Sequence, residues 1–128
     1  MVAGGRARYL VAVIRRGAGR RERAARGVRL RAVCRLDELE EGRGRMIEID
    51  GRCLAVFRVR AGGVFAIDNA CPHRDGPLAW GDLRESTVYC PVHAWPFDLA
   101  TGRCRDVPGA AVRTYPARVE GDSVWIEL

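Results

Sequence analysis

The 128-residue sequence lacks a long hydrophobic run. The apolar stretch in its first segment, residues 9–14, is six residues long. A membrane-spanning helix needs about 20 apolar residues, and a secretory signal needs about 7–15 after its positive region. We therefore expect neither a membrane anchor nor an export signal, and we expect a soluble, cytoplasmic protein.

Histidine and lysine are also scarce. The two histidines are His73 and His93, and all 22 basic residues are arginines. If both histidines bind metal, none remains for a Ser-His-Asp or Cys-His catalytic group, or for a mononuclear 2-His-1-carboxylate iron site. Without lysine there is no G-x-x-x-x-G-K-[ST] phosphate-binding pattern. We therefore expect no nucleotide or flavin on this chain, and we exclude a complete oxygenase, for which 128 residues leave no room.

The charges are unevenly distributed along the chain. Residues 1–27 hold eight of the 22 arginines and one of the 16 acidic residues, which leaves 14 and 15 in residues 28–128. The net charge of +6 is thus a property of the first segment, and the abundance of arginine is typical of a GC-rich genome. We expect residues 1–27 to be a disordered, Arg-rich extension. An organellar transit peptide and a contact with an anionic partner such as nucleic acid are weaker alternatives.

Two short segments carry the chemistry. Residues 71–73 read Cys-Pro-His, and after a gap of sixteen residues, residues 90–93 read Cys-Pro-Val-His. Two thiolates and two imidazoles suit an iron–sulfur cluster or zinc, and do not suit magnesium or calcium. Structural zinc sites usually place a cysteine pair before a histidine pair. The mixed order here favours a two-iron centre with both cysteines on one iron and both histidines on the other, and a structural zinc module is the remote alternative.

Residues 68–78 and 90–102 resemble the two cluster loops of the Rieske-type [2Fe–2S] proteins, and the similarity extends over residues 28–128. The resemblance implies one Rieske cluster per chain. It also implies which side chains bind the cluster: Cys71 and Cys90 on the inner iron, and His73 and His93 on the outer, exposed iron.

The resemblance also bears on the reduction potential. High-potential members of the family have a disulfide between the two loops, at positions that are Gly76 and Val92 here, and a serine where this chain has Trp95. With fewer hydrogen bonds to sulfur, we expect a ferredoxin-like potential near the lower end of the Rieske range of about −150 to +300 mV. We further expect Trp95 and Phe97 to pack beneath the second loop, and Pro108 to cover the cluster.

The rest of residues 28–128 consists of short apolar runs broken by Gly and Asp, a pattern that predicts an all-β fold. The Rieske family implies an antiparallel β sandwich with a small cluster-binding subdomain formed by two loops. Cys34, Cys53 and Cys104 are an odd number of remaining cysteines, so we expect buried thiols and no disulfide framework. Asp50-Gly51 and Gly121-Asp122 predict hairpin turns. The expected strands are residues 28–33, 46–49, 53–59, 64–67, 87–89, 112–119 and 124–128, with one helical turn in residues 36–40.

The resemblance suggests an electron carrier that is a non-catalytic component of an oxidoreductase system. The amino-acid sequences of the two loops and of residues 112–121 most resemble those of the small subunit of an NAD(P)H-dependent nitrite reductase. The alternative is the ferredoxin component of an aromatic-ring dioxygenase or a related oxygenase. The expected partners are a flavin- or sirohaem-containing reductase, or an oxygenase.

Overall fold

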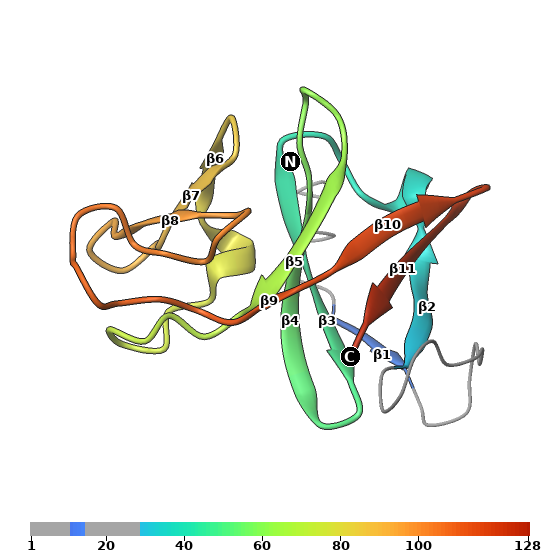
Figure 1. The fold of residues 1–128 in the computed structure, drawn as a ribbon, viewed down its shortest axis with the longest axis horizontal. Helices are drawn as coiled ribbons and strands as arrows, with labels where there is room; N and C mark the ends of the chain where they lie inside the picture. The colour runs from blue at the N-terminus through green and yellow to red at the C-terminus, as the bar shows by residue number, and fades with distance from the viewer. Residues whose placement is uncertain (1–10, 15–28) are drawn as a thin grey trace, which may run out of the picture.

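The computed structural model describes residues 11–14 and 29–128 (Figure 1), and in these residues the predicted all-β class is confirmed. The regular elements are strands of two to seven residues and two short 3₁₀ helices. They are β1 (Val11–Ile14), β2 (Leu30–Arg35), η1 (Leu36–Glu38), β3 (Arg43–Ile49), β4 (Arg52–Arg58), β5 (Val64–Asp68), η2 (Leu78–Trp80), β6 (Asp82–Arg84), β7 (Thr87–Tyr89), β8 (Pro96–Asp98), β9 (Thr114–Tyr115), β10 (Ala117–Glu120) and β11 (Ser123–Glu127).

The described strands form three sheets. A five-stranded sheet has the order β1-β3-β4-β5-β9, and a three-stranded sheet has the order β10-β11-β2. A second three-stranded sheet, β6-β7-β8, lies to the left in Figure 1 and forms the core of the expected small subdomain. Neighbouring strands are antiparallel except for β1, which pairs with β3 in parallel.

The central strand β4 is buried on both faces, which explains its continuous apolar sequence. Leu54 and Val56 belong to a hydrophobic core between the five-stranded sheet and the β10-β11-β2 sheet, whereas Ala55 and Phe57 belong to a second core beneath the subdomain. Successive side chains of a strand point to opposite faces of the sheet, so one short run can serve both cores. The five-stranded sheet therefore lies between the other two sheets and carries the subdomain on one face.

Both predicted hairpin turns are present. β3 and β4 pair from Ile49↔Arg52 outward, and Asp50 and Gly51 between them have φ values of 51° and 81°. A type I′ turn requires positive φ at both central residues, and its twist matches that of the two strands of a hairpin. The second hairpin joins β10 to β11 through the predicted residues 121–122.

The expected strand of residues 112–119 is not continuous. Pro116 divides it into β9, which pairs with β5, and β10, which pairs with β11. Proline has no backbone N–H to give to a ladder, although its carbonyl here accepts a hydrogen bond from the Glu127 N–H at 2.9 Å. The break lets one segment cross from one sheet to the other.

Four residues of the expected N-terminal extension are described in the structure. They form β1, which pairs in parallel register with Met46–Ile49 of β3. Four residues are enough for a strand. The rest of the expected extension lies outside the described residues.

The junction between the subdomain and the central sheet is very close. A Cβ atom on Gly44 of β3 would lie 2.7 Å from the Ala79 carbonyl oxygen and 2.6 Å from the Phe57 ring. Only glycine lets η2 approach the sheet to this distance. Gly44 thus fixes where the subdomain, and with it the cluster loops, sits on the sheet.

Candidate metal centre

The two loops that carry the expected ligands have the same backbone construction. In the first, the Cys71 N–H donates to the Gly76 carbonyl at 3.0 Å and the Asp75 N–H donates to the Cys71 carbonyl at 2.7 Å. In the second, the Cys90 N–H donates to the Trp95 carbonyl and the Ala94 N–H to the Cys90 carbonyl. Each cysteine therefore closes a tight turn with the residues four and five positions later, and the histidine lies inside that turn.

Left-handed backbone conformations shape both turns. Asp75, His93 and Ala94 have φ values of 58°, 69° and 56°. Such values cost an L-residue about 1–2 kcal/mol and persist where the surrounding structure dictates them. In the second loop two consecutive residues are left-handed, and one of them is an expected ligand.

The four expected ligands lie as two pairs. Cys71 and Cys90 are buried, with 0% and 2% exposure. The His73 and His93 rings have centroids 5.0 Å apart at an interplanar angle of 56°, and are half-buried and exposed, respectively. Within residues 11–14 and 29–128, no three His, Cys, Asp or Glu groups are placed to hold one metal ion together.

Electrostatics act in opposite directions on the two kinds of expected ligand: they favour the neutral imidazole of His73 and disfavour the thiolate of Cys90. Burial, and then the neighbouring His93 and Arg74, lower the pKa of His73, so its imidazole is neutral over a wider pH range. Burial raises the pKa of Cys90, and Cys71 raises it further, while the Val92 N–H lowers it by donating to the Cys90 Sγ at 3.4 Å. That N–H is oriented to stabilise a thiolate.

A buried asparagine supports the first loop. The Asn69 Oδ1 accepts a hydrogen bond from the Ala79 N–H at 2.9 Å, and its carbonyl accepts one from the Leu78 N–H at 2.8 Å. The loop is thereby joined to η2, which rests on β3. The neighbouring Asp68 accepts a hydrogen bond from the Tyr115 hydroxyl at 2.7 Å, so the strand that enters the loop is also held from β9.

Gly76 provides the closest contact between the loops. A Cβ at this position would lie 2.7 Å from the Cys90 Sγ and 3.4 Å from the Val92 Cβ. The second distance is close to the Cβ–Cβ separation of a disulfide, about 3.5–4.5 Å, so these two positions do face one another as the family resemblance implied. The structure holds no bond there.

The expected packing residues are confirmed in part. Phe97 is fully buried beneath the second loop, while Trp95 is half-buried and stacks on the His73 ring, with centroids 4.3 Å apart and planes 17° apart. Pro108 is exposed, and its expected role as a cover for the centre stays a prediction. Val107, its neighbour, packs against the core that contains both of the cysteines expected to be ligands. Sequence reasoning missed the stacking because it joins residues from different loops.

The three remaining cysteines differ from one another. Cys104 is buried in the same core as Cys71 and Cys90, as expected for the residue closest to the centre. Cys34 is partly buried and Cys53 is exposed, which corrects the expectation that all three are buried. All five cysteines are free thiols in the structure.

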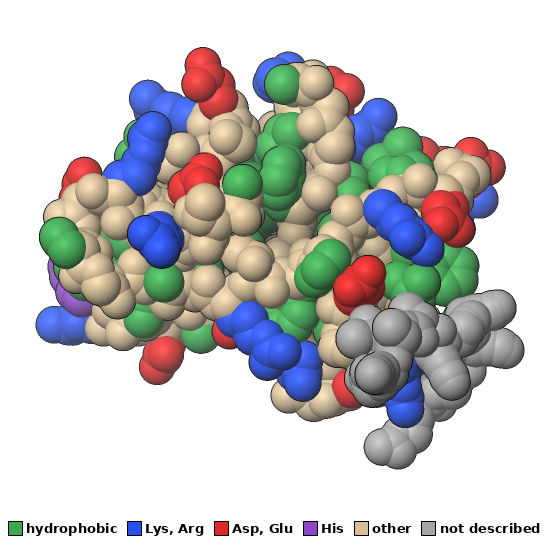
Figure 2. Space-filling view, in the orientation of Figure 1, with side chains coloured by type: hydrophobic (Ala, Val, Ile, Leu, Met, Phe, Trp, Pro, Cys, Tyr) green, Lys and Arg blue, Asp and Glu red, His purple; other side chains and the backbone are tan. Residues whose placement is uncertain are grey.

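A cleft of about 470 Å³ lies away from these loops. It lies between the β4–β5 turn and the β6–β7 hairpin, where the space-filling view is hollowed at the top (Figure 2). Its lining includes Val59, Arg60, Leu83 and Glu85, and none of the expected ligands. Among the described residues, no helix has the length and apolar character to span a bilayer.

Comparison with known proteins identifies the family. Residues 29–127 match the model of the Rieske-like [2Fe–2S] domain. The chain belongs to this family. It is 35% identical over 94 residues to the ferredoxin component of the naphthalene 1,2-dioxygenase system of Pseudomonas aeruginosa, which covers 73% of this chain and 89% of the relative. This Rieske domain is thus an electron-transfer protein whose cofactor is a [2Fe–2S] cluster.

Solved structures have the same fold. A putative NADH-dependent nitrite reductase small subunit from Mycobacterium tuberculosis superposes with a TM-score of 0.73 at 29% identity, covering 77% of this chain and 94% of that one. The ferredoxin of carbazole 1,9a-dioxygenase from Nocardioides aromaticivorans IC177 gives a TM-score of 0.69 at 32% identity, covering 76% and 95%. The predicted Rieske-type sandwich with its two-loop subdomain is confirmed.

The residues present fit a Rieske cluster. The His73 Nδ1 is buried and has no hydrogen-bond partner, as expected of a nitrogen whose lone pair is kept for a metal. The donor set of two thiols and two imidazoles, arranged as a buried pair and a more exposed pair, matches the two unlike irons of such a centre.

Proposed function

We propose that Cys71 and Cys90 bind the inner iron of the Rieske cluster and that His73 and His93 bind the outer iron. The pairing of the side chains, the unpartnered His73 Nδ1 and the matching backbone turns of the two loops support this assignment. When bound, a Rieske cluster accepts and releases one electron at a time.

We further propose that the protein carries electrons between a reductase and a terminal enzyme in the cytoplasm. The observation that carries this proposal is the exposure gradient across the four ligands. The cysteines are buried in the protein core, whereas the His93 ring is exposed. Histidine side-chain atoms are visible at the left edge of the surface in Figure 2. A docked partner would meet the imidazoles first.

Two partner systems are candidates. The small subunit of an NAD(P)H-dependent nitrite reductase is our first choice, supported by the sequences of the two loops and by the structural similarity to the M. tuberculosis protein. The ferredoxin component of a ring-hydroxylating oxygenase is the second, favoured by the higher sequence identity to such ferredoxins. In both systems the flavin belongs to another polypeptide.

Electron paramagnetic resonance tests the ligand assignment. Protein purified without oxygen and reduced with dithionite should give the low average g value of a cluster with imidazole on one iron. His73→Ala and His93→Ala should each abolish that signal, while Cys53→Ser, which removes an exposed cysteine outside both loops, should retain it. A wild-type signal from either histidine variant would refute the assignment, and a zinc-loaded protein without a signal would indicate a structural module.

Reoxidation assays distinguish between the two candidate partner systems. The reduced protein is mixed with a sirohaem nitrite reductase subunit or with a ring-hydroxylating oxygenase, and its reoxidation is followed by absorbance. Rapid, saturable reoxidation by the first alone supports our first choice, and by the second alone supports the alternative. Reoxidation by neither, at rates above that of the protein alone, would contradict the carrier role in both systems.

A further inference from the structure

A stacked aromatic contact connects the two cluster loops at one of the expected ligands. The Trp95 indole comes from the second loop and stacks on the His73 imidazole of the first, with centroids 4.3 Å apart and planes 17° apart. The contact of the His93 ring with His73 is tilted, not stacked. The His73 ring therefore has a stacked aromatic neighbour, whereas its contact with the His93 ring is tilted.

The backbone of Trp95 is anchored on both sides. Its carbonyl accepts the Cys90 N–H at 2.9 Å, which closes the second loop. The next residue, Pro96, begins β8, and its carbonyl accepts the Arg105 N–H at 2.9 Å. The half-buried indole also packs against the core that contains Cys71 and Cys90. An indole fixed in this way presents a rigid surface to its neighbour.

The orientation of the His73 ring depends on packing against such a surface. Its Nδ1 is buried without a hydrogen-bond partner, so no hydrogen bond of that atom sets the orientation of the ring. The loops approach closely at Gly76 and Val92 but are not covalently joined there. The alignment of the first loop with the second therefore depends on packing, and the stacked pair is a packing contact made by an expected ligand itself.

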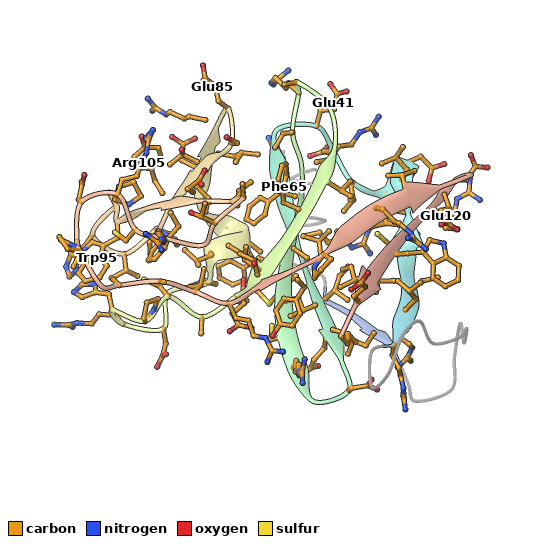
Figure 3. All side chains as sticks on the ribbon, viewed as in Figure 1. Glu41, Phe65, Glu85, Trp95, Arg105 and Glu120 are labelled. Atoms are coloured by element: carbon orange, nitrogen blue, oxygen red, sulfur yellow. The ribbon has the colours of Figure 1, made fainter. Side chains whose placement is uncertain are left out.

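We propose that Trp95 is a positioning residue that orients the His73 ring so that Nδ1 faces the cluster, and that it braces the two loops where the chain has no disulfide. The inference rests on the proposed role of His73 as a ligand. Figure 3 places Trp95 at the end of the molecule far from Glu120, so a change there leaves the β10–β11 hairpin untouched.

Pulsed electron paramagnetic resonance on the reduced holoprotein tests the proposal. This method resolves the couplings of the two ligating imidazole nitrogens. In Trp95→Leu, one nitrogen coupling should shift or broaden while the other stays unchanged, and in Trp95→Phe, which retains a ring, both should stay close to wild type. Trp125→Leu, in the distant strand β11, is the matched control and should leave both couplings unchanged.

Cluster retention provides a second readout. With a chelator in excess, Trp95→Leu should lose iron about two- to twelvefold faster than wild type, the factor that corresponds to the ordinary strength of an aromatic pair. Unchanged nitrogen couplings together with an unchanged rate of iron loss in this variant would overturn the proposal. If Trp95→Leu takes up no iron, Trp95→Met, which fills more of the space without a ring, is measured by the same criteria. Failure of the ligand assignment is distinct, because it appears as a wild-type signal in His73→Ala.

Discussion

Replacing Gly76 with alanine should impair cluster binding more than it impairs folding. The added Cβ would lie 2.7 Å from the Cys90 Sγ and 3.0 Å from the Val92 Cγ2, whereas non-bonded heavy atoms prefer about 3.5–4.0 Å. The φ of Gly76 is not in the left-handed region, so the effect is steric. The atom that would have to move is the sulfur of a proposed iron ligand.

The magnitude follows from the cost of overpacking. Inserting a methyl group into a well-packed site costs about 1–3 kcal/mol. If the bound cluster holds the Cys90 thiolate in place, this cost weakens cluster binding, by about five- to 150-fold. If instead the thiolate swings aside, the cluster loses a ligand, and the loss is larger still.

Gly51→Ala is the matched control. Gly51 has a φ of 81°, and a Cβ added there would have no neighbouring atom within 4 Å, so alanine costs about 1–2 kcal/mol of backbone strain far from the cluster. Both variants should show similar losses of stability in far-ultraviolet circular dichroism melts. Only Gly76→Ala should lose its iron at chelator concentrations lower than those that wild type requires. Equal iron retention in wild type and Gly76→Ala would refute the steric argument.

Three further predictions concern residues around the centre and the remaining thiols. Ala94→Gly should stabilise the protein by about 0.5–1 kcal/mol in urea unfolding, because Ala94 has a φ of 56° and glycine relieves that strain; a loss of stability would contradict this. Tyr115→Phe should cost about 1–2 kcal/mol by removing the hydrogen bond to Asp68. Burial and that carboxylate raise the pKa of Tyr115, so wild-type stability should fall as the pH rises past 10, and the variant should lack this component of the fall. Cys53 should react with Ellman's reagent well before Cys34 at pH 8, because Cys53 is exposed and burial raises the pKa of Cys34 to about 11; equal rates, measured by mass spectrometry, would argue otherwise.

The sequence is enough to propose the centre, because metal binding constrains residue type and spacing. Cys71, His73, Cys90 and His93 can be proposed from their order alone, and the hairpin at residues 50–51 from its turn chemistry. β6 and β8 are not predicted, because three-residue strands show too little alternation to be distinguished from loops.

Contacts between segments distant in sequence cannot be predicted in the same way. Nothing local marks Gly76 as a neighbour of Cys90, or Trp95 as a neighbour of His73, since each pair joins the two loops. The strand at residues 11–14 is not predicted from its own sequence, because its pairing with β3 depends on an edge that only the folded sheet provides. In each case the missing information is the position of the partner.

The burial of the two cysteines proposed as ligands links the fold to the proposed electron transfer. Cys71 and Cys90 belong to the same hydrophobic core as Ala55 and Phe57 of the central strand, so the proposed inner iron site is built on the most buried part of the sheet. The histidines lie outside this core, and one of them is exposed. The buried cysteine side of the proposed site limits the movement of the ligands when the charge of the cluster changes. The exposed histidine side gives a partner protein close access to the site. We therefore expect substitutions such as Phe57→Leu, which loosen the core, to slow electron exchange with a partner more than they alter its affinity, and stopped-flow rates measured across partner concentrations would separate the two.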